Sequence, residues 1–262
     1  MTNDKSGVGN RSDMHLRVID RLGLADAVTV TNAGVGFLAV VAATVDVELA
    51  ARLILVAAIA DGLDGVVARH RGSTPVGPHL DSLADVASFG VAPAALVAAV
   101  VLETHPFASD PLPAALGMAA GALFVAMAVA RLGLYTAYDS GSRETVGVPT
   151  TLAATVLAAA VLAGYADPTL LAIAAAAFAV LMGTTISYPD LHAQDALVMG
   201  VVQAAVILAP VATFLVPTLP AWIGEGFAFA LLFLACGYLL LGPWFYWGDG
   251  LGTVPEGDEG AS

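Results

Sequence analysis

The sequence predicts an all-α fold, a polytopic membrane helix bundle, and three observations support this prediction. Of the 262 residues, 58% are hydrophobic and only 12% are charged, whereas a soluble globular domain carries about 25% charged residues. The mean hydropathy is +0.85. The apolar residues also gather into long segments, each close to the roughly 20 residues that a helix needs to cross the hydrocarbon core of a bilayer.

Eight such segments follow one another, and we expect about eight transmembrane helices. Alanine and glycine are frequent in them, and small residues allow helix backbones to approach closely in lipid. The fifth segment is short, and the break between Gly164 and Pro168 leaves the division of 151–187 open, so six spans are an alternative. The predicted spans are approximately 27–45, 49–68, 82–102, 114–135, 149–165, 168–187, 196–216 and 227–247.

The ends of the chain differ from the apolar middle. The first 26 residues are polar and lack the apolar run of a signal peptide, so insertion would depend on the internal segments. For 14–26, an interfacial helix and a frayed leader are equal alternatives. We therefore divide the chain into a polar N-terminal segment (1–26), a membrane core (27–188), two additional C-terminal helices (189–248) and an acidic tail (249–262).

The charge balance excludes several classes of function. The chain has 22 acidic residues against 9 lysines and arginines, a formal net charge of −13, so binding to nucleic acid has no electrostatic support. The single cysteine, Cys236, excludes a disulfide framework and a thiolate zinc site. An acidic excess is also expected of a protein exposed to high salt, where repulsion between charges is screened.

The basic residues predict the orientation, because short loops rich in lysine and arginine stay in the cytoplasm. With the N-terminus inside, eight of the nine basic residues face the cytoplasm, and only Arg52 falls near the opposite face. We expect a multi-pass protein of the cell membrane. An even number of spans places the acidic tail inside as well.

Four aspartates lie near the cytoplasmic ends of the second and third predicted spans: Asp61, Asp64, Asp81 and Asp85. One ionised carboxylate at the membrane centre costs about 2.5–3.5 kcal/mol on insertion scales, so four together require compensating cations. The i,i+3 and i,i+4 spacings place each pair on one helix face. The turn from Gly72 to Pro78 would bring both pairs to the same depth at the cytoplasmic face.

Four carboxylates without matching lysines form an oxygen-rich site that suits Mg²⁺, Mn²⁺ or Ca²⁺ rather than zinc or copper, and two ions can share it. Gly65 and Gly77 would expose backbone beside the carboxylates. Arg69 lies one turn beyond Gly65, where its guanidinium can pair with a phosphate. Metal ions, an arginine and a carboxylate that accepts a hydroxyl proton are the groups that phosphoryl transfer requires.

The order of these residues also forms a motif. Residues 61–85 read Asp-x-x-Asp-Gly-x-x-Ala-Arg, seven further residues, and then Gly-x-x-x-Asp-x-x-x-Asp. This resembles the signature of the CDP-alcohol phosphotransferase family, membrane enzymes that displace CMP from a CDP-linked lipid or alcohol by attack of a second alcohol. The gap from Arg69 to Gly77 is one residue shorter than the usual spacing. The resemblance covers about residues 27–188 and implies a six-helix catalytic core.

Further stretches are similar to the serine-using branch of this family. They are DSLADVASFGVAPA (81–94), VARLGLYTA (129–137) and VGVPTTLAA (146–154), and TVTNAGVGF resembles the family's Thr-x-x-Asn start. The second stretch has Leu134 where that branch has another arginine. The resemblance implies a CDP-lipid and L-serine as substrates, and a serine lipid and CMP as products. A salt-loving archaeal host would make the lipid archaeol, and a bacterial host would make it diacylglycerol.

The resemblance also implies roles for individual residues. A dinuclear magnesium or manganese site would be held by Asp61, Asp64, Asp81 and Asp85, with Asp85 also the general base on the incoming hydroxyl. The cytidine diphosphate pocket would be lined by Gly65, Ala68, Arg69 and Gly77, with Asn32 reaching it from the first span. Ser88 and Arg131 are candidates for the acceptor side, where an arginine can hold the carboxylate of serine. A cytoplasmic anchor is an equal alternative for Arg131.

Other readings remain open at this point. Glycerol phosphate or inositol phosphate is the alternative acceptor within the family, ranked second because phosphorylated acceptors need several basic side chains. A membrane cation transporter is the alternative from another class, although it would need carboxylates near the bilayer midplane. The family resemblance and the small-residue helices together lead us to expect a homodimer.

Overall fold

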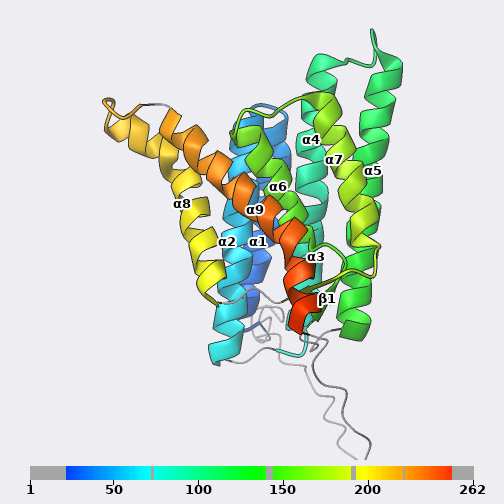
Figure 1. Cartoon of the computed structure of the whole chain (residues 1–262), viewed down its shortest axis with the longest axis vertical. Helices are drawn as coiled ribbons and strands as arrows, with labels where there is room; N and C mark the ends of the chain where they lie inside the picture. Colours follow the sequence, from blue (N-terminus) through cyan, green and yellow to red (C-terminus); the bar gives the residue numbers. More distant parts are fainter. Residues whose placement is uncertain (1–21, 72–73, 140–143, 190–192, 221, 250–262) are drawn as a thin grey trace, which may run out of the picture.

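The computed structural model describes residues 22–71, 74–139, 144–189, 193–220 and 222–249, and within these ranges the chain is a bundle of helices (Figure 1). All eight predicted segments are helical, which confirms the all-α class. The interfacial helix considered for 14–26 lies almost wholly outside the described residues, as does the acidic tail. The helices are α1 (Leu24–Ala43), α2 (Val47–Arg71), α3 (Gly77–Asp85), η2 (Val86–Val91), α4 (Ala92–Thr104), α5 (Pro111–Leu134), η3 (Tyr135–Asp139), α6 (Thr150–Leu162), α7 (Pro168–Met182), α8 (Ala193–Leu215) and α9 (Trp222–Asp249).

Five helical stretches of the described chain are long and apolar enough to cross a membrane: Leu24–Ala43, Gly77–Thr104, Pro111–Tyr138, Leu197–Leu215 and Trp222–Pro243. Helix α2 is long enough but carries Asp61 and Asp64 in its second half. Helices α6 and α7 have 13 and 15 residues, about 20 and 22 Å at 1.5 Å per residue, so each is shorter than a core about 30 Å thick. Gly164, with a φ of +84°, separates them and so resolves the division of 151–187 into two helices.

Helix α1 lies between the two elements that carry the aspartates. It packs along α2 on one side and against α3, η2 and the start of α4 on the other. The elements α3, η2 and α4 are continuous and form one stretch of 28 residues, Gly77–Thr104. In Figure 1, the end of α2 and the start of α3 are both at the lower end of the bundle, away from the connection between α4 and α5.

A π-helical turn, Val86–Val91, interrupts this long helix directly after Asp85. Its residues Ser88 and Phe89 have no exposed surface. The turn packs against α1 at Gly36, where an added Cβ would lie 2.8 Å from the Cα of Ser88. Only glycine leaves room for this approach. Short π-helical segments occur frequently at functional sites.

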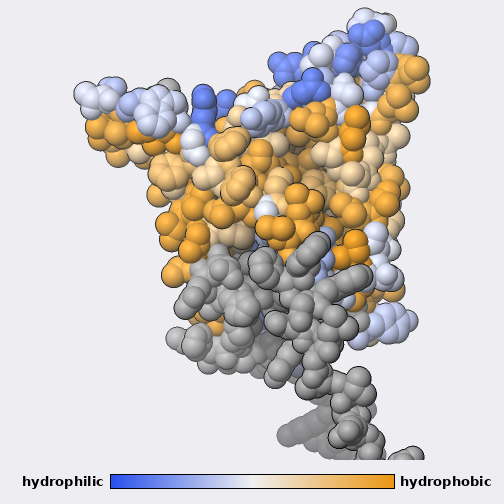
Figure 2. All heavy atoms as spheres, viewed as in Figure 1, coloured by the Kyte–Doolittle hydropathy of each residue, from blue (hydrophilic) through white to orange (hydrophobic). Residues whose placement is uncertain are grey.

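The interior is built from aliphatic and aromatic side chains shared by several helices. The largest of those that are fully buried include Ile54, Leu55, Phe89, Leu96 and Phe124. Figure 2 shows the opposite character outside: a broad apolar band covers the visible face, and hydrophilic residues gather at the end that holds the α4–α5 connection. This pattern is expected of a helix bundle surrounded by lipid.

The structure adds a pair of short strands that the sequence did not predict. Strands β1 (Glu144–Val146) and β2 (Ser187–Pro189) pair antiparallel, with Thr145 opposite Tyr188. The predicted segment 168–187 is therefore too long at its end, because α7 stops at Met182. Gly147 follows β1 with a φ of +75°, and its amide donates to the carbonyl of Ile186 at 2.8 Å.

The two C-terminal helices are joined to the rest of the bundle. Helix α9 packs against α6, α8 and β2. The hydroxyl of Tyr188 donates to the carbonyl of Leu239 at 3.4 Å, and the ring centroids of Tyr188 and Tyr238 are 6.2 Å apart. The segment that we predicted as an addition thus contributes to the packing of the core.

Candidate active site

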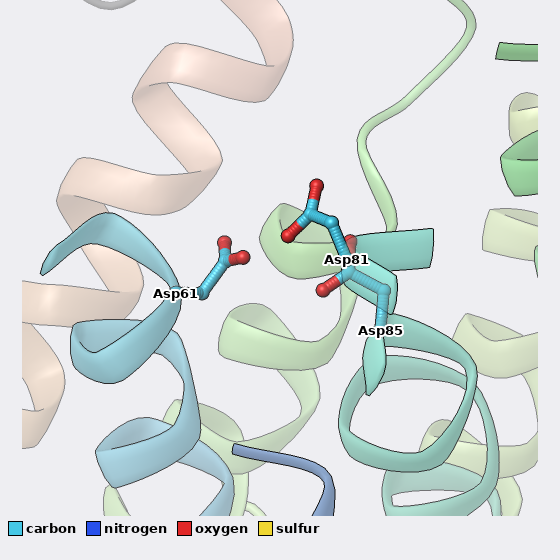
Figure 3. A group of neighbouring side chains, drawn as sticks. All are labelled: Asp61, Asp81 and Asp85. Atoms are coloured by element: carbon cyan, nitrogen blue, oxygen red, sulfur yellow. The ribbon is translucent and has the colours of Figure 1, made fainter. Parts of the chain in front are cut away.

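Three carboxylates converge from two helices. Asp61 lies on α2, whereas Asp81 and Asp85 lie one turn apart on α3, and Figure 3 shows the three side chains pointing toward one another. One oxygen of each lies within 4.8 Å of an oxygen of the other two. Ligand oxygens around a divalent cation have separations of this order, because each binds at about 2.0–2.6 Å from the ion. The three aspartates could therefore hold a metal ion.

The surroundings of Asp85 favour a bound cation. Its side chain is 8% exposed, and among the described residues its Oδ1 atom, which is buried, has no hydrogen-bond donor. The negative charges of Asp61, Asp81 and Asp64 repel its carboxylate, whereas the positive charge of Arg131 attracts it. A buried carboxylate needs a cation or a proton to offset the loss of hydration. The residues present therefore fit a divalent metal ion.

Asp64, the fourth aspartate, is held differently. It is 5% exposed, and its Oδ2 atom accepts a hydrogen bond of 2.7 Å from the hydroxyl of Thr29 on α1. It is not one of the three that converge within 4.8 Å. Its negative charge nevertheless repels the carboxylates of both Asp61 and Asp81. Asp64 thus borders the cluster, with its Oδ2 atom bonded to α1.

Asn32 and Ser88, which we assigned to different substrates, contact each other. The hydroxyl of Ser88 lies 2.9 Å from the backbone carbonyl of Asn32 and 3.2 Å from its Oδ1 atom. Both residues are buried, at 1% and 0% exposed. The Nδ2 atom of Asn32 has no acceptor among the described residues, so it can still donate to a ligand. Ser88 has no surface for substrate in this conformation, and its contact fixes η2 to α1.

Arg131 lies near the cluster on the last turn of α5 and is half-buried. Its positive charge attracts the carboxylate of Asp85. Close by, Ser82 of α3 hydrogen-bonds to Thr136 of η3, and the hydroxyl of Thr136 also donates to the carbonyl of Leu132 at 2.9 Å. This joins the helix that carries Asp81 and Asp85 to the end of the helix that carries Arg131.

The remaining predicted residues lie at the ends of α2 and α3. Gly65 follows Asp64 on α2 and is half-buried, and Gly77 is the first residue of α3, with its amide donating to the carbonyl of Thr74 at 3.1 Å. Ala68 and Arg69 fall in the last turns of α2, and their side chains lie outside the described residues. Of the residues predicted for the cytidine diphosphate pocket, Gly65 and Gly77 therefore lie on the same two helices as the converging aspartates.

Sequence reasoning missed three residues that hold this arrangement together: Asp26, Thr29 and Thr74. Asp26 is 2% exposed, and its Oδ2 atom accepts from the amide of Gly23 at 2.7 Å and from the hydroxyl of Thr74 at 2.8 Å. This bonds the start of α1 to the connection between α2 and α3. Gly23 immediately precedes α1, and Asp26 lies three residues after it. An acidic side chain at this position commonly accepts from the amide of the residue before the helix, and this capping pattern was the available signal for Asp26.

Comparison with known proteins supports the chemistry suggested by this cluster. The family model for CDP-alcohol phosphatidyltransferase matches residues 22–186. That range begins just before α1, includes all four aspartates, and ends just before β2. Helices α8 and α9 lie beyond it.

Curated relatives match much of the same region. A protein named archaetidylserine synthase from Methanothermobacter thermautotrophicus is 30% identical over 185 residues, which cover 69% of this chain and 75% of that protein. A CDP-diacylglycerol–serine O-phosphatidyltransferase from Bacillus subtilis is 31% identical over 143 residues, 53% of this chain and 75% of its own length. One with the same name from Mycobacterium leprae is 41% identical over 98 residues, 37% of this chain and 30% of its own.

Proposed function

Because this chain belongs to the CDP-alcohol phosphatidyltransferase family, we propose that it transfers the lipid-bearing phosphate of a CDP-lipid to L-serine. The carrying observation is the convergence of Asp61, Asp81 and Asp85 from two helices, with their oxygens within 4.8 Å of one another. The names of the relatives support serine as the acceptor, since the three described above are all serine lipid synthases by name.

The bonds that change define the reaction. The hydroxyl oxygen of serine attacks the phosphorus that carries the lipid, the bond from this phosphorus to the oxygen of CMP breaks, and CMP leaves. Asp85 accepts the hydroxyl proton. Its buried position and its unbonded Oδ1 atom support this role, because a base must have a free lone pair aimed at the reacting group.

The four aspartates would hold Mg²⁺ or Mn²⁺, and two ions are part of this proposal. Bound there, a divalent ion supplies positive charge that neutralises the diphosphate and the leaving group. Asp64 would contribute its remaining oxygen, and Arg131 would offset part of the negative charge near Asp85. The anionic substrate then meets a site that is close to neutral rather than strongly negative.

The nucleotide and the acceptor would enter from different sides. The cytidine diphosphate would lie along Gly65, Ala68, Arg69 and Gly77, with the free Nδ2 atom of Asn32 as a donor to it. Arg131 would pair with the carboxylate of serine, because a guanidinium fits a carboxylate through two parallel hydrogen bonds. The bond from Ser88 to Asn32 favours a positioning role for Ser88 beside Asp85.

Archaeol is the lipid backbone that we propose, with diacylglycerol as the alternative. The acidic composition and the archaeal relative support archaeol. We place the site at the cytoplasmic face of the cell membrane, since eight of the nine basic residues fall on that side of the predicted topology. We also propose a homodimer, because alanine-rich and glycine-rich helix faces allow two copies to pack closely.

The test uses the full chain, purified in detergent, with labelled L-serine and either CDP-archaeol or CDP-diacylglycerol. We expect CMP release and a labelled serine lipid only when Mg²⁺ or Mn²⁺ is present. Faster turnover with glycerol phosphate or inositol phosphate would overturn the serine assignment. Uptake of divalent cations into sealed vesicles without CMP release would favour the transporter reading instead.

A further inference from the structure

Thr29 hydrogen-bonds to Asp64 at the edge of the carboxylate cluster, and the sequence assigned it no role, although it stands in the TVTNAGVGF stretch. It lies on α1, is 5% exposed, and reaches across to α2, where its hydroxyl is 2.7 Å from the Oδ2 atom of Asp64. Thr31, two residues further along the same helix, is exposed, and within the described part of the chain its hydroxyl donates to the backbone carbonyl of Ala27 at 2.8 Å. Two threonines of one helix thus have different partners.

The hydroxyl of Thr29 has two acceptors within hydrogen-bond distance. Besides Asp64, the carbonyl of Ala25 lies 3.1 Å away, the usual acceptor for a threonine inside a helix. A hydroxyl has a single proton, and a bond to an ionised carboxylate is shorter and stronger than one to a carbonyl. The shorter distance is the one to Asp64.

The dependence between the two residues is one-sided. Without Asp64, the hydroxyl of Thr29 still has the carbonyl of Ala25 as an acceptor. Without Thr29, the Oδ2 atom of Asp64 loses the hydrogen bond from α1, and only the backbone of Gly65, on the same helix as Asp64, still interacts with the carboxylate. Asp64 is therefore the residue whose orientation depends on this contact.

We propose that Thr29 is a positioning residue: it holds the Oδ2 atom of Asp64 and so fixes the orientation of this carboxylate beside the metal site that Asp61, Asp81 and Asp85 form. This rests on the proposed metal dependence of the site. Partners that orient a metal ligand through a hydrogen bond typically change metal affinity 10-fold to 100-fold when they are removed.

The bond between Asp26 and Thr74 supports the same arrangement from one turn earlier on α1. It connects the start of α1 to the segment that follows α2, at 2.8 Å. Two contacts less than one turn apart along α1 therefore hold the end of α2 in place. Thr29 acts on the orientation of one carboxylate, whereas Asp26 acts on the path of the chain.

The test compares T29V, which removes the hydroxyl at nearly constant volume, with T29S, which keeps it, and with T31V as the matched control. Binding of Mn²⁺ to the purified full chain is measured by the loss of the electron paramagnetic resonance signal of the free ion. We expect T29V to bind Mn²⁺ about 10-fold more weakly, and T29S and T31V to bind it as the wild type does. Thermal unfolding checks that each variant is folded.

A double variant separates positioning from general damage. In the D64N background, T29V should cause no further loss of Mn²⁺ affinity, because the carboxylate that it orients is gone. Where T29V does not yield folded protein, T29A removes the same hydroxyl and is read in the same way. An additional loss in the D64N background would overturn the proposal.

Two results distinguish this inference from the proposed function. Unchanged Mn²⁺ binding in T29V, with weakened binding in D64N, would overturn the role of Thr29 and leave the transferase reaction standing. Weakened binding in T29V together with no CMP release by the wild type would support the role of Thr29 and overturn the transferase reaction.

Discussion

The hydroxyl of Ser88 lies 2.9 Å from the backbone carbonyl of Asn32, and this contact ties the π-helical turn after Asp85 to the first helix. The carbonyl belongs to the middle of α1, so the two helices must be very close at this level. Gly36, one turn further along α1, permits the approach.

Replacement of Gly36 by alanine should therefore damage both the fold and the site. The new Cβ would lie 2.8 Å from the Cα of Ser88 and 2.9 Å from the backbone carbon of Ala87, and neither atom can move without shifting η2. Overpacking of this kind costs about 1–3 kcal/mol. We expect a lower thermal unfolding temperature and slower CMP release in G36A.

Gly34 provides the matched control, since it lies on the same helix and an added Cβ there would meet nothing within 4 Å. Alanine favours a helix over glycine by about 1 kcal/mol. G34A should thus unfold at the same or a higher temperature, with unchanged CMP release. Equal losses in G34A and G36A would contradict the account of this contact.

Asp85→Asn tests the general base. Asparagine keeps the shape of the side chain but cannot accept the proton of the serine hydroxyl, and loss of a positioned base typically lowers the rate about 10²–10⁴-fold. We expect the turnover number for CMP release to fall by at least 100-fold while the protein stays folded. E103Q removes a carboxylate near the other end of the same long helix and should keep full activity. A normal rate in D85N would reject Asp85 as the base.

Removal of divalent ions should lower stability as well as activity. A ligand that binds only the folded state adds about 2.7 kcal/mol to the free energy of unfolding when its concentration is 100 times its Kd. We expect Mn²⁺ to raise the unfolding temperature of the wild type, and EDTA to reverse this.

Asp61→Asn is the comparison for that experiment, because Asp61 is one of the three converging carboxylates. The increase with Mn²⁺ should shrink in D61N, at the same ionic strength set with KCl. If Mn²⁺ raises the unfolding temperature of D61N as much as that of the wild type, the ion binds elsewhere.

Arg131→Gln tests the acceptor side. Loss of the guanidinium should raise the KM for serine by about 10-fold or more, because a hydrogen bond to a charged group contributes about 1.5–3 kcal/mol. The KM for the CDP-lipid should change much less. R131K keeps the charge but not the paired geometry, so we expect an intermediate KM. A change confined to protein orientation in the membrane would instead support the anchoring role.

Gly147→Ala probes the connection between β1 and α6. The residue has a φ of +75°, which alanine adopts only with strain, and an added Cβ would also collide with the carbonyl of Met182. Gly164 has a similar φ of +84° but nothing within 4 Å of an added Cβ. Both variants should be less stable, and G147A should lose about 1–3 kcal/mol more than G164A in unfolding experiments, because it alone is overpacked. Equal losses of unfolding free energy in the two variants would show that backbone strain at positive φ, and not overpacking, causes the destabilisation.

Hydropathy predicted the helices well because a membrane span is a long apolar run that few other structures require. The break at Gly164 was also predictable, because the segment from Gly164 to Pro168 interrupts the apolar run. The π-helical turn at Val86–Val91 was not predictable, because its apolar residues are equally typical of an α-helix. The strands at Thr145 and Tyr188 are too short to show an alternating pattern.

The spacing of the aspartates predicted which residues meet, since i,i+4 places Asp81 and Asp85 on one face. It did not predict that Asp64 would turn to α1. A threonine in an apolar helix usually bonds to the backbone of its own helix, as Thr31 does, so Thr29 gave no signal of its partner. Likewise, the serine of the SFG stretch suggested a substrate contact, whereas the structure buries Ser88 against Asn32.

The three contacts that α1 makes with the site have a consequence for how the protein is assembled. They join residues 35, 48 and 56 positions apart, and all of them end before α4 begins. Synthesis at about 5–20 residues per second delivers the N-terminal part of a chain first, and domains fold in that order. The aspartate cluster can therefore form in the membrane while the later helices are still on the ribosome, so truncation after η2 should leave these three contacts intact in the nascent chain.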